Sequence, residues 1–202
     1  MSAAKPRPAG YGTVYVVRHG RTALNAAGVL RGRLDPPLDD VGEEEARALG
    51  TLFANCHVDA VVCSPLQRAR QTAQPFADAT GATLASEDAF VDRDYGPWAG
   101  KTRAEVESRY GSLDRAPEIE PMGSLVGRVV FAARAVAARF DSVVIVGHDV
   151  VNRALLATLA SNTVDEPDAI PQRTGCWNKL EHIESTWVAT VVDAVPGDGR
   201  VP

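Results

Sequence analysis

The stretch VYVVRHGRT, residues 14–22, determines which fold the chain is expected to adopt. The apolar and aromatic run Val14–Val17 predicts a buried strand. The next four residues, Arg-His-Gly-Arg, end that strand with cationic or near-cationic side chains around a glycine. Such an ending indicates either a site for an anion or the ordinary polar flank of a strand that meets water. The rest of the chain has to distinguish these two interpretations.

Two further apolar runs end in a similar way. The run Asp59–Ser64 predicts a second strand with Arg68 one turn into the following helix, and SVVIVGH, residues 142–148, predicts a third. Helical patterns separate the strands, over Asp40–Ala54, from Ser64 to about Ala79, from Thr102 toward Tyr110, over Ser124–Arg139 and over Val150–Ser161. This alternation predicts an α/β fold, a three-layer α/β/α sandwich with a mostly parallel central sheet and helices on both faces.

Local signals fill in the remaining segments. The motifs SPLQ, residues 64–67, and TRAE, residues 102–105, are capping-box patterns that predict helix starts. The segment TLASEDAF, residues 83–90, is predicted to be irregular or weakly extended. Two late strands are expected over 176–183 and 186–195. Residues 1–202 are predicted to form one domain, with 1–12 as a flexible leader and 80–123 as an excursion over the active site.

Bulk composition excludes several classes of function. The 202 residues are 45% hydrophobic and 23% charged, as in ordinary globular domains. A net charge of −5 argues against a nucleic-acid binder, and no apolar run approaches the roughly 20 residues that span a bilayer. Without an apolar signal core, and with three sparse cysteines, the chain is expected in the cytoplasm. No metal and no cofactor is expected, because the four histidines lack metal-ligand spacing.

The strand ends point to phosphate chemistry. Because the carboxyl ends of parallel strands share one edge of a sheet, Arg18, His19, Arg68 and His148 are expected to lie together. Arginine binds phosphate oxygens in pairs, and a neutral imidazole is a competent nucleophile at phosphorus. Such a site would also need a proton donor for the leaving oxygen. A lone histidine or arginine would more often be a solvated residue, so the prediction rests on their coincidence at the three strand ends.

Two competing sites have weaker support in the sequence. Cys63 ends a strand, but the spacing to Arg68 does not match a cysteine-based phosphate loop, and a free cysteine is most often a small buried hydrophobe. The pair Asp92 and Asp94 loosely matches the motif of aspartate-based phosphatases, but the segment before it is too polar for the firm strand that motif requires.

Four segments in order resemble the histidine phosphatase superfamily, in its phosphoglycerate mutase-like branch. They are VVRHGRTALNAAGVLRGRLDPPLDDVG (16–42), VVCSPLQRARQTA (61–73), DRDYGPWAGKT (92–102) and VVIVGHDVVNRALL (143–156). The resemblance covers about residues 13–195. It implies a metal-independent phosphomonoesterase that acts on a small phosphorylated metabolite through a phosphohistidine.

The resemblance also implies roles for residues of this sequence. His19 would be the nucleophile, with Arg18, Arg68 and His148 holding the phosphoryl oxygens. Asp92 would be the proton donor, where the family more often has glutamate, and Glu87 and Asp88 are minor candidates. The residues expected to bind substrate are Arg21, Thr22, Asn25, Arg31, Gly32, Tyr95 and Asp149.

The substrate and the exact activity stay open. Arg21, and Gly123 in MGSL, depart from the family pattern and leave substrate identity undetermined. The trio Arg21, Arg31 and Arg33, with Tyr95 and Trp98 expected to be exposed, suggests a further anionic or planar group on the substrate. The alternatives are a cofactor-dependent phosphoglycerate mutase-type phosphotransferase and a non-catalytic binding member of the same fold. A homodimer through the late strands is also a possible arrangement.

Overall fold

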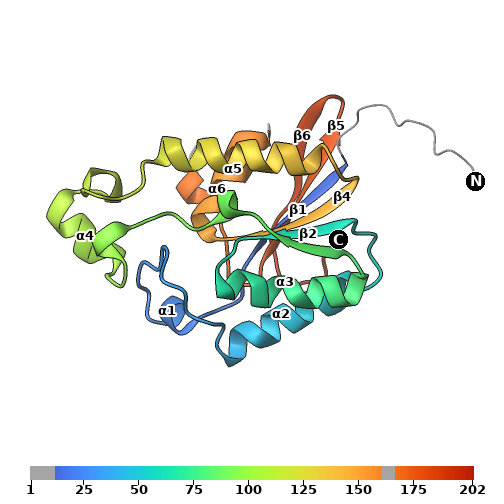
Figure 1. The fold of residues 1–202 in the computed structure, drawn as a ribbon, viewed down its shortest axis with the longest axis horizontal. Coiled ribbons are helices and arrows are strands. Elements are labelled where there is room, and N and C mark those ends of the chain that lie inside the picture. Colours follow the sequence, from blue (N-terminus) through green and yellow to red (C-terminus); the bar gives the residue numbers. More distant parts are fainter. Residues whose placement is uncertain (1–11, 161–166) are drawn as a thin grey trace, which may run out of the picture.

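The computed structural model describes residues 12–160 and 167–202 as a six-stranded sheet between two layers of helices (Figure 1). The strand order is β3-β2-β4-β1-β5-β6. The strands are β1 (Thr13–Arg18), β2 (Ala60–Cys63), β3 (Thr83–Ser86), β4 (Ser142–Gly147), β5 (Trp177–Ile183) and β6 (Thr186–Ala194). The helices are α1 (Ala23–Ala26), α2 (Asp40–Phe53), α3 (Gln67–Thr80), α4 (Arg103–Tyr110), α5 (Met122–Ala137) and α6 (Asp149–Leu159).

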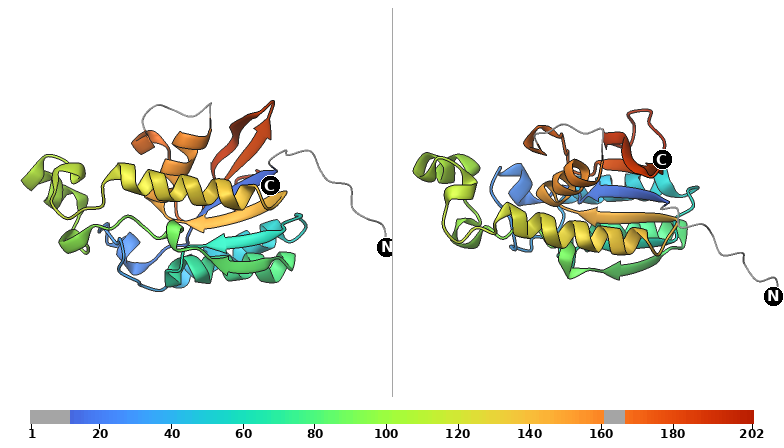
Figure 2. Two further views of the ribbon diagram at one scale, coloured as in Figure 1. Left: turned by 45° about the horizontal axis from the view of Figure 1, so that its top comes forward. Right: turned by 90° about the horizontal axis from the view of Figure 1, so that it is seen from above.

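The sheet is mostly parallel, as predicted. Strands β1 to β4 pair in parallel. Strand β5 continues the sheet antiparallel to β1, and β6 pairs antiparallel to β5. Helices α5 and α6 cover one face, and α2 and α3 cover the other (Figures 1 and 2). The predicted three-layer sandwich is therefore confirmed.

Side chains of the central strands alternate between the two helical layers. Val14 and Val16 of β1 pack in the core beneath α5 and α6, whereas Tyr15 and Val17 pack against α2 and α3. Strand β4 alternates in the same way, with all six of its residues buried. The apolar runs read from the sequence are thus strands covered on both faces, which is typical of parallel sheets.

The register of the sheet aligns the carboxyl ends of β1, β4 and β2 at one edge. Arg18 pairs with Gly147 in the β1–β4 ladder, so the next residues, His19 and His148, leave the sheet side by side. On the other side of β4, Cys63 pairs with Val146 and Ser64 follows at the same edge.

Two local predictions were incomplete or wrong. Residues 83–86 form β3, an edge strand paired with β2, whose four residues are all exposed and so show no hydrophobic pattern. The predicted excursion over 80–123 therefore starts with a strand of the sheet. The SPLQ box does not cap a helix, because α3 begins at Gln67 after Leu66, with no side-chain cap. Instead the amide of Gln67 donates to the carboxylate of Asp35, at 2.6 Å.

Residues 87–121 form a protrusion beyond the ends of β1 and β4 (Figure 2). It contains α4, whose predicted Thr102–Glu105 capping box is present. The protrusion has a small core of its own, made of Tyr95, Val106, Leu113, Ala116 and Ile119. It is also tied to the loop after α1 by a bridge between Val29 and Thr102.

The predicted leader, 1–12, lies outside the described residues except for Gly12. The helix predicted over Val150–Ser161 corresponds to α6, and its expected last residue also lies outside the described part. Among the helices in residues 12–160 and 167–202, none is long and apolar enough to cross a membrane.

Candidate active site

His19 is held by backbone contacts directly after β1. Its amide donates to the Gly147 carbonyl at 3.1 Å, and its carbonyl accepts from the amide of Gly175 at 3.2 Å. Its Nδ1 lies 2.6 Å from the carbonyl oxygen of Gly20. A carbonyl can only accept, so Nδ1 bears the proton and Nε2 presents a lone pair. That lone pair accepts a hydrogen bond from Nε of Arg68 at 3.2 Å.

The His19 ring is neutral by environment as well as by tautomer. It has no exposed surface, and burial, with the nearby Arg68 and Arg18, lowers the pKa of His19 well below its ordinary value. The turn after it requires glycine, because a Cβ on Gly20 would lie 2.4 Å from the Gly42 carbonyl oxygen of α2. The strand end and the first turn of α2 thus hold a neutral imidazole whose unprotonated Nε2 faces Arg68.

His148 lies beside His19, at the start of α6. The two ring centroids are 5.2 Å apart. Nε2 of His148 lies 2.8 Å from the Ser64 hydroxyl, which also accepts from the amide of Leu66. We assign the Ser64 hydroxyl as the donor and Nε2 of His148 as the acceptor of this hydrogen bond. The ring proton is then on Nδ1 of His148, which lies 3.8 Å from Asp92. Burial, followed by the charge of Arg68, lowers the pKa of His148 well below its ordinary value.

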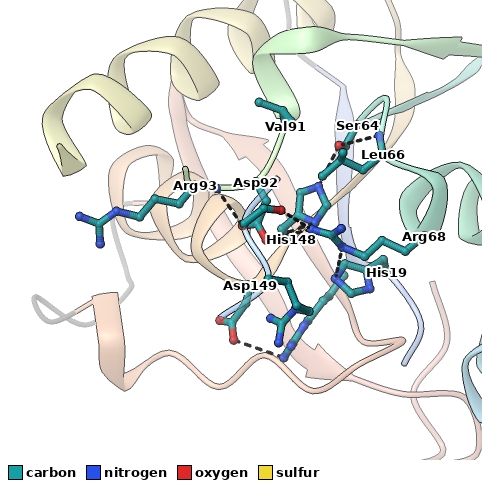
Figure 3. Close-up of polar contacts among 12 residues, drawn as sticks. His19, Ser64, Leu66, Arg68, Val91, Asp92, Arg93, His148 and Asp149 are labelled. Atoms are coloured by element: carbon teal, nitrogen blue, oxygen red, sulfur yellow. Dashed lines mark hydrogen bonds and ion pairs between the residues drawn. The ribbon is translucent and has the colours of Figure 1, made fainter. Parts of the chain in front are cut away.

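Arg68 connects His19 to the remaining groups (Figure 3). Its guanidinium is fully buried in the first turn of α3. Nη1 donates to the Leu34 carbonyl at 2.7 Å, and Nη2 donates to the Gly32 carbonyl and to Oδ2 of Asp92, both at 3.0 Å. Gly32 has φ +51°, which favours glycine, and a Cβ there would meet the protrusion within 3.0 Å. Arg68 therefore stands between His19 and Asp92 in a fixed orientation.

Arg18 approaches from the opposite side. It is the last residue of β1, and its Nη1 donates to the Gln172 carbonyl and lies 3.3 Å from Oδ2 of Asp149. The Gln172 side chain in turn hydrogen-bonds to Asn152 and Asn178, so a buried amide network supports the Arg18 contact.

Asp92 is a buried carboxyl at the cavity wall. It is 3% exposed and lies in the irregular stretch 91–95 of the protrusion. Burial raises the pKa of Asp92 against the opposing effect of Arg68 and Arg31. A raised pKa keeps this carboxyl protonated to higher pH than an ordinary aspartate, which is the state an acid catalyst needs. Glu87 and Asp88 do not line the cavity, since Glu87 caps a short turn and Asp88 is exposed.

An open cavity of about 480 Å³ lies in front of these groups. Six of the predicted site residues line it: Arg18, Asn25, Arg31, Asp92, Tyr95 and Asp149. His19, Arg68 and His148 lie fully buried behind this lining. Three buried nitrogens among the predicted site residues have no hydrogen-bond partner: Nε of Arg18, Nε of Arg31 and Nδ1 of His148. Unpaired buried donors are costly, so this concentration indicates a site for an acceptor-rich ligand.

Other predicted substrate contacts are used elsewhere. The Arg21 guanidinium pairs with Asp39 at 3.0 Å, and Arg33 pairs with Asp94 at 3.1 Å. Neither arginine lines the cavity, so of the predicted basic trio only Arg31 does. Thr22 is buried as the N-cap of α1, where it forms a capping box with Asn25. Gly32 contributes its carbonyl to Arg68 rather than a lining surface.

The expectation that Tyr95 and Trp98 are exposed was wrong. Tyr95 is 5% exposed, and Trp98 packs edge-on against Tyr110 and donates to the Pro117 carbonyl at 2.9 Å. Tyr95 belongs to the core of the protrusion, and Trp98 is partly buried and packs against that core. Tyr95 still lines one wall of the cavity, so the aromatic surface there is part of a packed cluster.

The competing sites find no support in the geometry. Cys63 has no exposed surface, and burial raises the pKa of its thiol, so it lacks the thiolate character of a catalytic cysteine. Asp94 pairs with Arg33 and accepts from the amide of Gly96. Within the part of the chain that the structure describes, no group of three or more potential metal-ligating side chains is found.

Several residues at the site were not predicted. Ser64 hydrogen-bonds to His148, Gln172 holds Arg18, and the cavity is also lined by Arg103, Arg153 and Asp168. Ser64 could have been found, because it follows β2 at the same sheet edge as the two histidines. Gln172 and Asp168 lie outside every motif read from the sequence, whereas Arg103 and Arg153 lie inside the TRAE box and the segment 143–156, which do not distinguish them from other helix residues.

A model of the histidine phosphatase superfamily (branch 1) matches residues 14–194 of the chain. The chain is 30% identical over 178 residues to "Uncharacterized phosphatase PhoE" of Bacillus subtilis, covering 86% of this chain and 90% of the relative. It is 31% identical over 156 residues to "Phosphoserine phosphatase 1" of Hydrogenobacter thermophilus, covering 71% of this chain and 74% of the relative.

The fold is also found among solved structures. YhfR of Bacillus stearothermophilus superposes with a TM-score of 0.81 at 24% identity, covering 91% of this chain and 98% of YhfR. At this level of identity the likeness shows the fold alone. The architecture around the cavity is therefore one that related chains also adopt.

Proposed function

The chain belongs to branch 1 of the histidine phosphatase superfamily as a phosphatase-type member, and on that premise we propose that it is a metal-independent phosphomonoesterase. Its substrate would be a small phosphorylated metabolite, hydrolysed through a phosphohistidine at His19. The observation that supports this most directly is the tautomer of His19. A buried, neutral ring with Nδ1–H bound to Gly20 has its Nε2 lone pair directed at a fixed arginine.

In the proposed first step, His19 displaces the alcohol. Nε2 forms a bond to phosphorus while the bond from phosphorus to the ester oxygen breaks. The carboxyl of Asp92 donates its proton to that oxygen, so the product leaves as a neutral alcohol. Positive charge develops on the imidazole, and the Nδ1–H bond to the Gly20 carbonyl stabilises it. Arg18, Arg68 and His148 bind the phosphoryl oxygens in place of metal ions.

In the second step, water regenerates the enzyme. The Asp92 carboxylate accepts a proton from the water as its oxygen bonds to phosphorus. The bond between phosphorus and Nε2 breaks, its electron pair returns to His19, and inorganic phosphate leaves. One carboxyl thus serves as acid and then as base, which requires a single position close to the reacting oxygens.

The wall beyond Asp92 suggests a second polar group on the substrate. Arg31, Arg103 and Arg153 face this part of the cavity. Arg103 and Arg153 already contact Asp168 or its carbonyl, whereas Nε of Arg31 has no partner. We therefore assign Arg31 to a second anionic group of the substrate, which favours phosphoglycerates and phosphoserine, whose carboxylate supplies one, over sugar monophosphates and unsubstituted alkyl phosphates.

Phosphate release tests this proposal. The protein is incubated in EDTA with p-nitrophenyl phosphate and with a panel of sugar phosphates, phosphoglycerates, nucleotides and phosphoserine, ranked by kcat/KM. We expect turnover in EDTA and a phosphorylated His19 peptide after rapid quenching. Absence of turnover on every ester would favour the binding alternative. Conversion of 3-phosphoglycerate to 2-phosphoglycerate with a bisphosphoglycerate primer, faster than phosphate release, would favour the mutase alternative.

Location and assembly are further parts of the proposal. The three cysteines are unpaired, two of them buried, which is typical of a reducing compartment and supports a cytoplasmic location. A homodimer stays a prediction. Since β5 lies between β1 and β6, only β6 offers a free sheet edge on that side.

A further inference from the structure

The stretch that contains Asp92 has no secondary structure to hold it. Residues 91–95 form neither helix nor strand. Their backbone carbonyls therefore need partners from elsewhere in the fold. The Asp92 side chain itself contacts Arg68, its only ion pair shorter than 3.5 Å among the described residues. The position of the Asp92 carboxyl therefore depends on contacts of its backbone, and not only on the groups that would bind the phosphoryl group.

Arg128 of α5 supplies those partners. Nη1 donates to the carbonyl of Ala89 at 2.6 Å and to that of Val91 at 2.8 Å, and Nη2 donates to that of Asp92 at 3.3 Å. Its neighbours Leu125 and Val129 are fully buried in the core of α5 and α6. Arg128 therefore connects the Asp92 stretch to a helix that is itself anchored to the sheet.

Glu120 orients Arg128 and also hydrogen-bonds to the backbone of Asp94 in the same stretch. Its carboxylate accepts from Nε and Nη2 of Arg128 at 2.7 and 2.8 Å, and from the amide of Asp94 at 3.1 Å. The Glu120 backbone donates to the Asp94 carbonyl at 2.8 Å and accepts from Nε of Arg93 at 2.9 Å. A two-pronged pair of this kind is both strong and directional.

We propose that Arg128, oriented by Glu120, is a positioning residue that holds the Asp92 carboxyl within reach of the leaving oxygen. This inference rests on the proposed function, in which Asp92 is the proton donor. Arg128 does not line the cavity, and its effect passes through the backbone at Ala89, Val91 and Asp92. A displacement of about 1 Å in a catalytic group lowers turnover by about 10²-fold, so the loss of this clamp is expected to be measurable.

The test uses the pKa of the leaving group. p-Nitrophenolate leaves readily without a proton, whereas an alkoxide needs one. The full-length protein and its Arg128→Met variant are assayed with p-nitrophenyl phosphate and with the alkyl phosphate that the unmodified protein hydrolyses fastest. Asp92→Asn provides the benchmark for complete loss of the acid. Arg134→Met, an exposed arginine on the same helix, is the matched control.

We expect Arg128→Met to lower kcat on the alkyl ester by about 10- to 100-fold, with KM and the p-nitrophenyl phosphate rate changed less than about threefold. Arg128→Lys should recover part of the loss, because one ammonium can replace some of the five contacts. Where Arg128→Met is too unstable to assay, Arg128→Lys and Glu120→Gln take its place with the same expected leaving-group dependence.

Three outcomes overturn the inference. Equal losses on both esters would show that Arg128 only stabilises the fold. An unchanged alkyl rate would show that the clamp is not needed. If the protein turns over both esters but Asp92→Asn shows no leaving-group dependence, the assignment of the acid fails and the inference fails with it. If Asp92→Asn shows leaving-group dependence and Arg128→Met does not, the positioning role of Arg128 is refuted. The proposed function is then still supported.

Discussion

The cavity lies between two regions that position their side chains by different means. His19 and His148 stand at the ends of adjacent buried strands, where backbone register sets their separation. Asp92 stands in the protrusion 87–121, which has a core of five buried side chains and is joined to the rest of the molecule by Phe90, buried in the main core, and by hydrogen bonds. We therefore expect the proposed nucleophile to be as stable as the sheet, and the proposed acid to depend on a region that opens locally before the sheet unfolds.

The largest effect is expected at the sheet end. Replacing His19 with alanine removes the nucleophile, so kcat should fall by about 10⁴-fold or more on every ester, whatever its leaving group. Phosphate release measures the loss, with the exposed His57→Ala as the control. Retention of substantial turnover, or a loss confined to alkyl esters, would contradict the assignment of His19.

A change on the protrusion side should behave differently. Asp92→Asn removes the proton donor but leaves the nucleophile intact. We expect kcat to fall by about 10²- to 10⁴-fold on alkyl esters and far less on p-nitrophenyl phosphate. Rates against the pKa of the leaving group measure this. A uniform loss across the series would mean that Asp92 does not act as the acid.

A pair of core substitutions compares the stability of the two regions. Leu125→Ala removes a fully buried side chain from the main core, and should lower the free energy of unfolding by about 2–5 kcal/mol. Leu113→Ala removes one of the five buried side chains of the protrusion core. Most of the lost free energy should appear as easier local opening of the protrusion rather than as a lower free energy of global unfolding.

Hydrogen exchange and urea unfolding together measure that difference. In Leu113→Ala, amides of 87–121 should exchange about tenfold faster or more, while global unfolding changes by less than about 1 kcal/mol. Alkyl-ester turnover should fall more than p-nitrophenyl phosphate turnover. Loss of global stability as large as in Leu125→Ala would show that the protrusion and the sheet unfold as one unit.

The smallest effect is a pH dependence of stability. Burial lowers the folded-state pKa of His19 and His148, so below about pH 6.5 the unfolded chain binds more protons than the folded protein. The free energy of unfolding is therefore unaffected by these histidines above that pH. As the pH falls below it, each histidine lowers the free energy of unfolding by up to about 1.4 kcal/mol per pH unit. The raised pKa of Asp92 has the opposite effect: above the ordinary aspartate pKa, it lowers the free energy of unfolding as the pH rises.

Urea unfolding between pH 7 and pH 5 measures this slope. Replacing His148 with glutamine keeps a polar side chain near Ser64 and removes one of the two histidine contributions, so the stability of the variant should fall less steeply with decreasing pH. Parallel curves for the two proteins would contradict the lowered pKa of His148.

The central strands, most helices and the edge where the strand-end residues meet could be predicted from the sequence, because each depends on a local pattern. Apolar runs identify strands buried on both faces, and parallel strands bring their ends together. Strand β3 gave no such signal, since its four residues are exposed and it joins the sheet through its backbone ladder with β2. The SPLQ box was misleading because α3 begins three residues after Ser64, whose hydroxyl accepts from the amide of Leu66 and contacts His148 instead.

Contacts between distant segments were decided only in the tertiary structure. The basic trio looks equivalent along the chain, yet Arg21 and Arg33 meet aspartates whereas Arg31 faces the cavity. The clamp of Arg128 joins residues 36 to 39 positions apart, and no local periodicity encodes it. The sequence alone therefore determined which residues follow the buried strands. Which loop approaches them, and which charge stays unpaired, depends on how the protrusion packs against α5 and the sheet edge.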